Sequence, residues 1–163
     1  MSVGDASLAA SSIIFPSGTV QSGLSGVAIS QGTTTIRFPS LGAMSPGRRV
    51  PVPDTDLAHS STFGFAYAND IARASMSARI PTDFTTGSII VREKLRAPDS
   101  TVPEALVVML KRESGFNQKA NDWEFLTISS DLKKIVQREK EGKCLAYHGS
   151  EAKNDFVFRY PAP

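Results

Sequence analysis

The sequence predicts an α+β domain, with a predominantly antiparallel β-sheet and a few packed helices. Its 163 residues are enough for one domain with a hydrophobic core and too few for two of ordinary size. Hydrophobic residues make up 40% and charged residues 21%, the balance of a globular chain. One helix signal is followed by several consecutive strand signals, and this order favours antiparallel strands with helices packed on one face.

A helix is predicted after Asn69 and Asp70, whose side chains are suited to cap a helix beginning near Ile71. Apolar and small residues then recur at helical spacing as far as Arg79. Pro81 has no N–H and restricts the residue before it, so it is expected to end this helix.

Four strands are predicted next, at residues 88–95, 105–111, 123–128 and 133–140. The second of them is apolar on both faces, which indicates a central strand. The fourth is heavily charged, as is typical of a solvated edge that resists aggregation. A short helix at 143–153 and a last strand at 156–158 complete the predicted domain.

The first 56 residues differ in composition, being rich in Ser, Gly, Thr and Pro. We expect a partly ordered arm over residues 1–56, followed by the domain proper over 57–163. Short strands are predicted at 11–20 and 33–38, and residues 45–53 have the composition of an extended linker.

Charge and apolar content exclude several classes of protein. A net charge of +2 is too small for a nucleic-acid binder. The longest purely apolar run, at 105–110, is far short of the roughly 20 residues of a membrane span. The single cysteine, Cys144, excludes a disulfide framework and multi-thiolate metal sites. Residues 1–10 lack the features of a secretory signal, so we expect a cytoplasmic protein if the chain is complete, and a periplasmic or secreted one if a leader was removed.

Seven segments occur in an order and at spacings that resemble one known family. They are His59 with Tyr67–Arg73, then Phe84–Gly87, Ser88–Lys94, Val108–Asn117, Asn121–Phe125, Gly142–Gly149 and Ala152–Phe158. The chain resembles the cytochrome P460 family, which includes the cytochromes c′-beta, over roughly residues 59–159.

The resemblance implies an antiparallel β-domain with a few helices, a homodimer, and one c-type haem. The family's haem is held by a Cys-x-x-Cys-His motif with the histidine as axial iron ligand. P460 members also bond a lysine to the porphyrin and oxidise hydroxylamine, whereas the c′-beta members bind nitric oxide at an apolar face.

Two positions depart from that pattern. Cys144 and His148 match the first cysteine and the axial histidine, but Tyr147 stands where the second cysteine is expected. Arg92 stands where the cross-linking lysine is expected, and its guanidinium is a far poorer nucleophile than an amine. Lys94 is a minor alternative cross-linker, since residues two apart on a strand share a face.

These departures predict a divergent P460-like protein that has lost covalent haem and reuses the former haem pocket for a small molecule. Arg92, Tyr147 and His148 are the candidate catalytic or ligand-lining residues. No cofactor is favoured under this hypothesis. The alternative is a haem protein with His148 as iron ligand and Cys144 as a single thioether anchor, which binds nitric oxide or oxidises hydroxylamine-like substrates. A structural or interaction domain is the third hypothesis.

Each candidate also has a simpler interpretation. Tyr147 is expected to pack, Cys144 to be a half-buried free thiol, and His59 to be structural. For Arg92 the simpler interpretation is an ion pair with Glu93 or Glu124. Glu113 and Glu124 are general-base candidates only where an apolar cavity raises a pKa; otherwise they belong to a solvated strand face. Four residues are expected in the core, namely Met109, Phe116, Trp123 and Phe125, and Phe116 and Trp123 would line the pocket in a functional interpretation. No other catalytic signature is present.

Overall fold

A computed structural model describes residues 28–31, 34–37, 41–43, 66–78, 82–97, 99–100, 102–131 and 133–158 of the chain. The first three of these segments are described by their backbone alone. The predicted strand at 11–20, the linker at 45–53, His59 and Pro81 lie outside the described residues.

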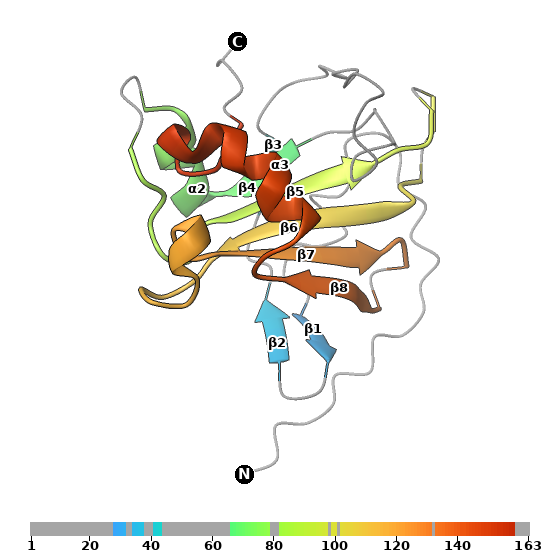
Figure 1. Cartoon of the computed structure of the whole chain (residues 1–163). Helices are drawn as coiled ribbons and strands as arrows, with labels where there is room; N and C mark the ends of the chain where they lie inside the picture. Colours follow the sequence, from blue (N-terminus) through green and yellow to red (C-terminus); the bar gives the residue numbers. More distant parts are fainter. Residues whose placement is uncertain are drawn as a thin grey trace.

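The centre of the structure is a six-stranded antiparallel sheet whose strand order follows the chain (Figure 1). Its strands are β3 (Leu41–Ala43), β4 (Ala66–Asn69), β5 (Ile89–Lys94), β6 (Ala105–Lys111), β7 (Trp123–Ser129) and β8 (Ile135–Glu139). A separate hairpin joins β1 (Ala28–Gln31) to β2 (Thr34–Arg37). The predicted α+β class is thus confirmed.

The strand predictions agree closely with the sheet. The predicted strand at 105–111 coincides with β6, which lies in the interior of the sheet and buries residues on both faces. The charged strand at 133–140 becomes β8, one edge of the sheet. The strand predicted at 33–38 appears as β2. Strand β4 was not predicted, because four residues of mixed polarity give no clear alternation.

Strand β3 lies within the predicted arm but pairs with β4, at the other edge of the sheet. At least this part of residues 1–56 therefore belongs to the sheet. The domain boundary at residue 56 stays a prediction.

Helix α2 (Asp70–Met76) confirms the predicted start, with Asn69 as its N-cap. The Asn69 side-chain oxygen accepts hydrogen bonds from the backbone N–H groups of Ala72 and Ile89, both at 3.0 Å. The Asn69 amide also donates to the Gly87 carbonyl at 2.8 Å. One side chain therefore joins β4, the start of α2 and the start of β5. The helix ends at Met76, with Ser77 as its C-cap, which is earlier than the end expected at Pro81.

At the C-terminus the predicted helix at 143–153 is two elements, α3 (Lys143–His148) and the 3-10 segment η3 (Gly149–Asn154). The predicted strand at 156–158 is wrong. Asp155 and Phe156 both adopt left-handed backbone conformations, with φ of 58° and 61°, and no strand forms there. Phe156 and Phe158 instead follow a turn, and their rings have different neighbours. Phe156 packs against the hydrophobic core, and Phe158 packs on Tyr147 and His148.

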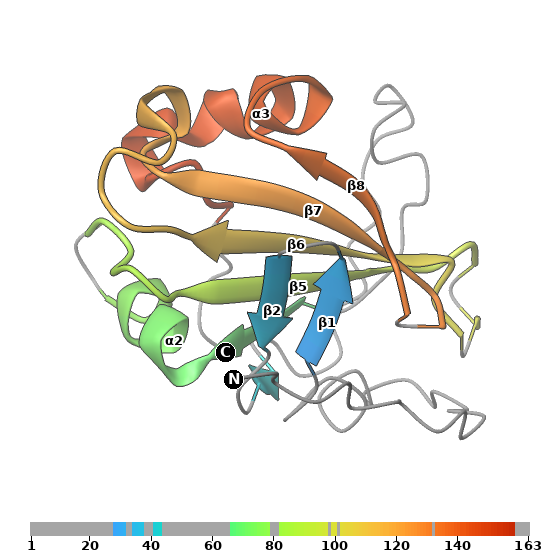
Figure 2. The same cartoon turned by 90° about the horizontal axis from the view of Figure 1, so that it is seen from below.

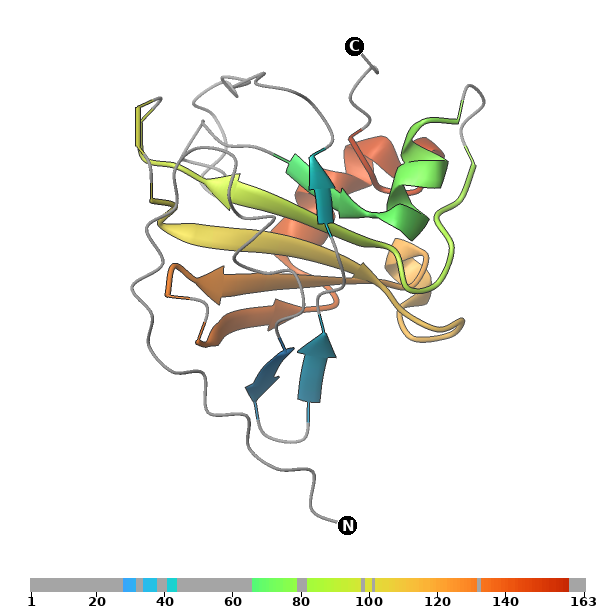
Figure 3. The same ribbon diagram turned by 180° about the vertical axis from the view of Figure 1, so that it is seen from behind.

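Two helical elements cover one face of the sheet. Both α3 and η3 cross in front of the strands in Figure 1 and lie behind them in Figure 3. Figure 2 shows α3 along the side of β7 and β8, with α2 at the far end of the sheet.

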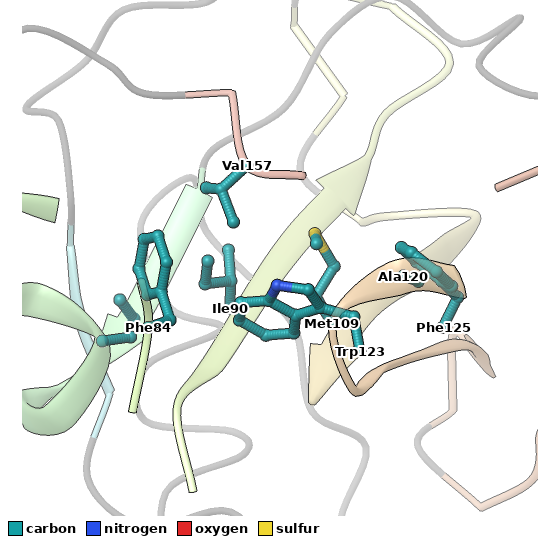
Figure 4. Close-up of a cluster of buried hydrophobic side chains, with 9 residues drawn as sticks. Phe84, Ile90, Met109, Ala120, Trp123, Phe125 and Val157 are labelled. Atoms are coloured by element: carbon teal, nitrogen blue, oxygen red, sulfur yellow. The ribbon is translucent and has the colours of Figure 1, made fainter. Parts of the chain in front are cut away.

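The hydrophobic core lies between that face and the elements that cover it (Figure 4). The register aligns Ala68, Ile90, Met109 and Phe125 in one row across four strands. Trp123 is fully buried and meets Phe84 edge to face, with ring centroids 5.5 Å apart. The core positions predicted for Trp123, Phe125 and Met109 are confirmed, whereas Phe116, also expected there, is only partly buried.

Candidate functional site

Helix α3 carries three of the four candidate residues onto the sheet. It follows Gly142, whose φ of 103° is a conformation that residues with a Cβ rarely adopt. The turn at this glycine directs the chain from β8 back over the covered face (Figure 1). Cys144 and His148 are four residues apart on α3 and therefore share one side of the helix.

His148 is buried, with 8% of its surface exposed, among aromatic rings. Its imidazole stacks on Phe125 of β7, with centroids 5.3 Å apart and planes at 30°. The rings of Tyr147 and Phe158 approach it edge-on, each at 5.4 Å. An imidazole thus lies in an aromatic enclosure directly over the sheet.

One hydrogen bond fixes the protonation pattern of this imidazole. His148 Nδ1 lies 2.8 Å from the backbone carbonyl oxygen of Phe156. A carbonyl oxygen only accepts, so Nδ1 carries a proton, and in the neutral imidazole the lone pair is then on Nε2. Histidines that ligate metals almost always donate their other ring N–H in this way.

The carbonyl that orients His148 belongs to a heavily anchored turn. The Asp155 carboxylate accepts two hydrogen bonds from Lys111 Nζ, both at 2.8 Å. It also accepts one from Asn121 Nδ2 at 2.7 Å and one from the Phe84 N–H at 2.6 Å. The indole N–H of Trp123 donates to the Asp155 carbonyl at 2.8 Å. Asp155 is therefore bonded to four residues that lie 32 to 71 positions away in the sequence.

Tyr147 is half-buried and packs on Phe158 in a tilted arrangement, with ring centroids 4.8 Å apart and planes at 33°. The packing role expected for this residue agrees with the contact. Its ring also forms one wall of the enclosure around His148.

Cys144 is a half-buried thiol that packs against the hydrophobic core beside Leu145. Burial raises its pKa to about 11, and the carboxylate of Glu139 contributes to the same shift. At neutral pH the sulfur is a protonated thiol. This is the opposite of the environment that activates cysteines.

Arg92 lies on the helix-covered face but in the next row of side chains. The register places Arg92 opposite Ala66 and Val107, and Val107 opposite Thr127, one row along from Ile90 and Phe125. Two strand spacings separate β5 from β7, about 10 Å. The structure therefore brings Arg92 to the same face as His148 without joining the two directly.

The alternative ion pairs of Arg92 do not form. Glu93 and Glu124 project from the opposite face of the sheet, because alternate residues of a strand face opposite ways. Glu124 is fully buried, and its carboxylate accepts hydrogen bonds from Arg112, at 3.1 Å, and from Arg138. The solvated face expected for Glu124 is wrong, and its place between two arginines argues against a general base.

Two other predicted residues lie apart from this site. Glu113 is exposed, and a local backbone hydrogen bond, with Arg112 adding to it, lowers its pKa. A lowered pKa is the wrong direction for the general base considered for it. Phe116 lies between two cationic side chains. The centroid of its ring is 3.8 Å from Lys140 Nζ and 5.0 Å from the Arg112 guanidinium carbon. Neither Phe116 nor the core residue Trp123 contacts His148 through a ring interaction in the described part of the chain.

Sequence reasoning missed Lys111 and Asp155 as a pair. Both are buried, and the lysine ammonium also lies 5.0 Å from the Trp123 ring. A lysine inside an apolar strand is unusual, since buried charges require partners. The lysine in an apolar strand could have been noticed from the sequence. Its partner could not be identified there, because Asp155 lies 44 residues further along the chain.

The fold and this arrangement define an antiparallel α+β domain with a buried, oriented histidine on its helix-covered face. No known family model matches the chain, and no curated protein matches it either. In the described segments no group of three or more His, Cys, Asp or Glu side chains is placed to hold a metal ion. None of the described helices has the length and apolarity needed to cross a membrane.

The residues fit one part of a haem site and not another. The oriented imidazole of His148 is suited to axial ligation of iron. Covalent attachment fits poorly, because Tyr147 replaces one thiol and the other belongs to a protonated cysteine packed on the core. The donor chemistry of these residues is therefore closer to non-covalent ligation of iron than to thioether attachment.

Proposed function

We propose that this is a divergent cytochrome P460-like protein that binds a small molecule at His148, without covalently attached haem. The supporting observation is the imidazole enclosed by Phe125, Tyr147 and Phe158, with Nδ1 bonded to the Phe156 carbonyl. In its neutral Nδ1–H form this imidazole has a second ring nitrogen, Nε2, of acceptor character. Small-molecule sites combine apolar lining with a few oriented polar groups in this way.

The chemistry of the side chains indicates the class of ligand. Aromatic rings favour a planar apolar body, and Nε2 favours an O–H or N–H donor. Arg92, on the same face, favours a carboxylate at the far end of the molecule. An acidic O–H held at Nε2 would be placed to transfer its proton to His148, which is the acid–base role this site supports.

A designed probe with these three features tests the proposal. 4-Hydroxybenzoate has a phenol, an aromatic ring and a carboxylate, and benzoate lacks only the phenol. In NMR titrations we expect 4-hydroxybenzoate to shift the His148 ring signals and to bind more tightly than benzoate. His148→Gln should abolish this preference, and Arg92→Gln should weaken both probes about tenfold or more, the value of a charge-assisted hydrogen bond. Glu113→Gln, at an exposed residue apart from the site, is the control.

Equal binding of both probes by the wild type and His148→Gln would contradict the proposal. Circular dichroism of each variant separates loss of binding from loss of folding. The resemblance also implies a homodimer, and light scattering on a sizing column tests that part separately.

Non-covalent haem is the second candidate, favoured by the hydrogen bond from His148 Nδ1 to a backbone carbonyl. Haem iron held by His148 would supply a coordination position for nitric oxide or a hydroxylamine-like substrate. Titration with ferric haem should then give a Soret band that acid–acetone extraction removes, and His148→Ala should abolish it. A band that survives extraction would establish a thioether at Cys144 and overturn the leading proposal.

A further inference from the structure

The left-handed turn at Asp155 and Phe156 presents the carbonyl that orients His148. Two consecutive residues with a Cβ adopt positive φ there, 58° and 61°. Each such residue costs about 1–2 kcal/mol relative to ordinary backbone. A turn of this kind persists only where surrounding contacts over-determine it.

Local backbone hydrogen bonds close the turn, and the contacts that tie it to the rest of the fold converge on Asp155. Its carboxylate receives four hydrogen bonds, two of them from the buried ammonium of Lys111 at the end of β6. Trp123 of β7 holds the Asp155 carbonyl, so the peptide unit that leads into Phe156 is fixed at both its side chain and its backbone. The next carbonyl along the chain is the one that accepts from His148.

We propose that Asp155, held by Lys111, is a positioning residue for His148, because the pair fixes the turn whose Phe156 carbonyl selects the Nδ1–H form of the imidazole. The use of that imidazole in ligand binding rests on the proposed function. The coupling between Asp155 and the imidazole tautomer does not.

The fold supplies a matched control in Glu124. This carboxylate is also fully buried and paired with cations, Arg112 and Arg138, but it projects from the opposite face of the sheet. Glu124→Gln therefore removes a comparable buried charge without touching the turn. A change in the His148 tautomer that both variants share would indicate general destabilisation. A change that only Asp155→Asn shows would indicate a positioning role.

The experiment reads the tautomer of His148 directly from its ring ¹⁵N shifts at a pH where the imidazole is neutral. The chain has two histidines, so His59→Gln assigns the signals. We expect wild type and Glu124→Gln to show the Nδ1–H form alone, and Asp155→Asn to show a mixture of both tautomers. Affinity for ferric haem, used as the probe, should fall about 10- to 100-fold in Asp155→Asn, the usual cost of removing a partner that orients a ligating histidine, and less than twofold in Glu124→Gln.

A gentler variant keeps the test decisive where Asp155→Asn fails to fold. Asn121 has a φ of 46°, which glycine adopts freely, so Asn121→Gly removes one hydrogen bond to Asp155 with little backbone cost. We expect this variant to change the tautomer mixture of His148 and the affinity for ferric haem in the same direction as Asp155→Asn, but by less.

The outcomes separate the two proposals. An altered tautomer in Asp155→Asn, with no probe bound by any variant, supports positioning and overturns ligand binding. Probe binding through His148 that is unchanged in Asp155→Asn, with the Nδ1–H form intact, overturns positioning and leaves the proposed function standing.

Discussion

The ammonium group of Lys111 and the carboxylate of Asp155 form a buried ion pair, with both carboxylate oxygens 2.8 Å from Nζ and both side chains less than 10% exposed. The pair fastens the C-terminal turn to the end of β6. Each of the two carboxylate oxygens also accepts a second hydrogen bond, Oδ1 from Asn121 and Oδ2 from the Phe84 N–H. The buried carboxylate therefore has both an opposite charge and hydrogen-bond donors at each oxygen.

Replacing Lys111 by Met should destabilise the fold by about 3–5 kcal/mol, because it leaves the Asp155 charge buried and unpaired. The measurement is urea unfolding followed by circular dichroism. Arg96→Met is the control, since its pair with Glu104 is exposed and should contribute about 1 kcal/mol or less. Similar losses in the two variants would mean that the buried pair has no special role.

Asn69→Ala should cost about 2–4 kcal/mol, measured in the same way. The substitution removes the cap of α2 and leaves the buried Ile89 N–H without its acceptor. Asn69→Asp keeps the oxygen that accepts from Ala72 and Ile89 but sets its second carboxylate oxygen against the Gly87 carbonyl, where neither group can donate, so it should recover only part of the loss. Asp70→Ala, on an exposed neighbour, should change stability little.

Alanine substitutions at the two glycines that flank α3 should change the stability of the fold in opposite directions. At Gly142, φ is 103° and an added Cβ would lie 3.0 Å from a Glu139 carboxylate oxygen, so Gly142→Ala should destabilise by more than about 1 kcal/mol. At Gly149 the backbone is helical and nothing lies within 4 Å of the added atom. Gly149→Ala should stabilise by about 0.4–1 kcal/mol. Thermal unfolding midpoints give both signs, and a shared sign would contradict the described turn.

Cys144 should be a slow thiol. Its pKa of about 11 predicts that the rate of iodoacetamide alkylation in the folded protein rises until about pH 11, whereas in urea it levels off near the ordinary thiol value. Removing the neighbouring charge in Glu139→Gln should lower the pKa and speed the reaction at pH 8. Fast alkylation of the folded wild type at neutral pH would contradict the buried position.

The same shift predicts a change of stability with pH. Between the ordinary pKa of 9.0 and about 11, the folded state keeps the Cys144 proton that the unfolded state has lost. The stabilisation from this group is therefore complete below about pH 9 and is lost as the pH rises to about 11. Cys144→Ser should flatten part of this decline. Tyr67 adds to the decline above its ordinary pKa of 10.0, because burial, and then the nearby carboxylate of Glu93, raise its pKa.

Local patterns predicted much of the sheet because strand periodicity depends only on neighbouring residues. The apolar run of β6 and the alternation of β7 placed two interior strands correctly. The start of α2 was predicted because a cap acts over three residues. The strand at 156–158 was wrong for the same reason: alternating aromatic residues look like a strand until a distant lysine fixes the preceding turn.

The sequence by itself determined the class of fold, the helix start, the central strands and the candidates Cys144, Tyr147 and His148. Only the tertiary structure decided that Asp155 pairs with Lys111, that Glu124 is shared by two arginines, and which nitrogen of His148 carries its proton. Strand and helix patterns arise from backbone geometry within a few residues. Partners of a buried charge or an imidazole are chosen by packing between segments that the chain brings together only when it folds.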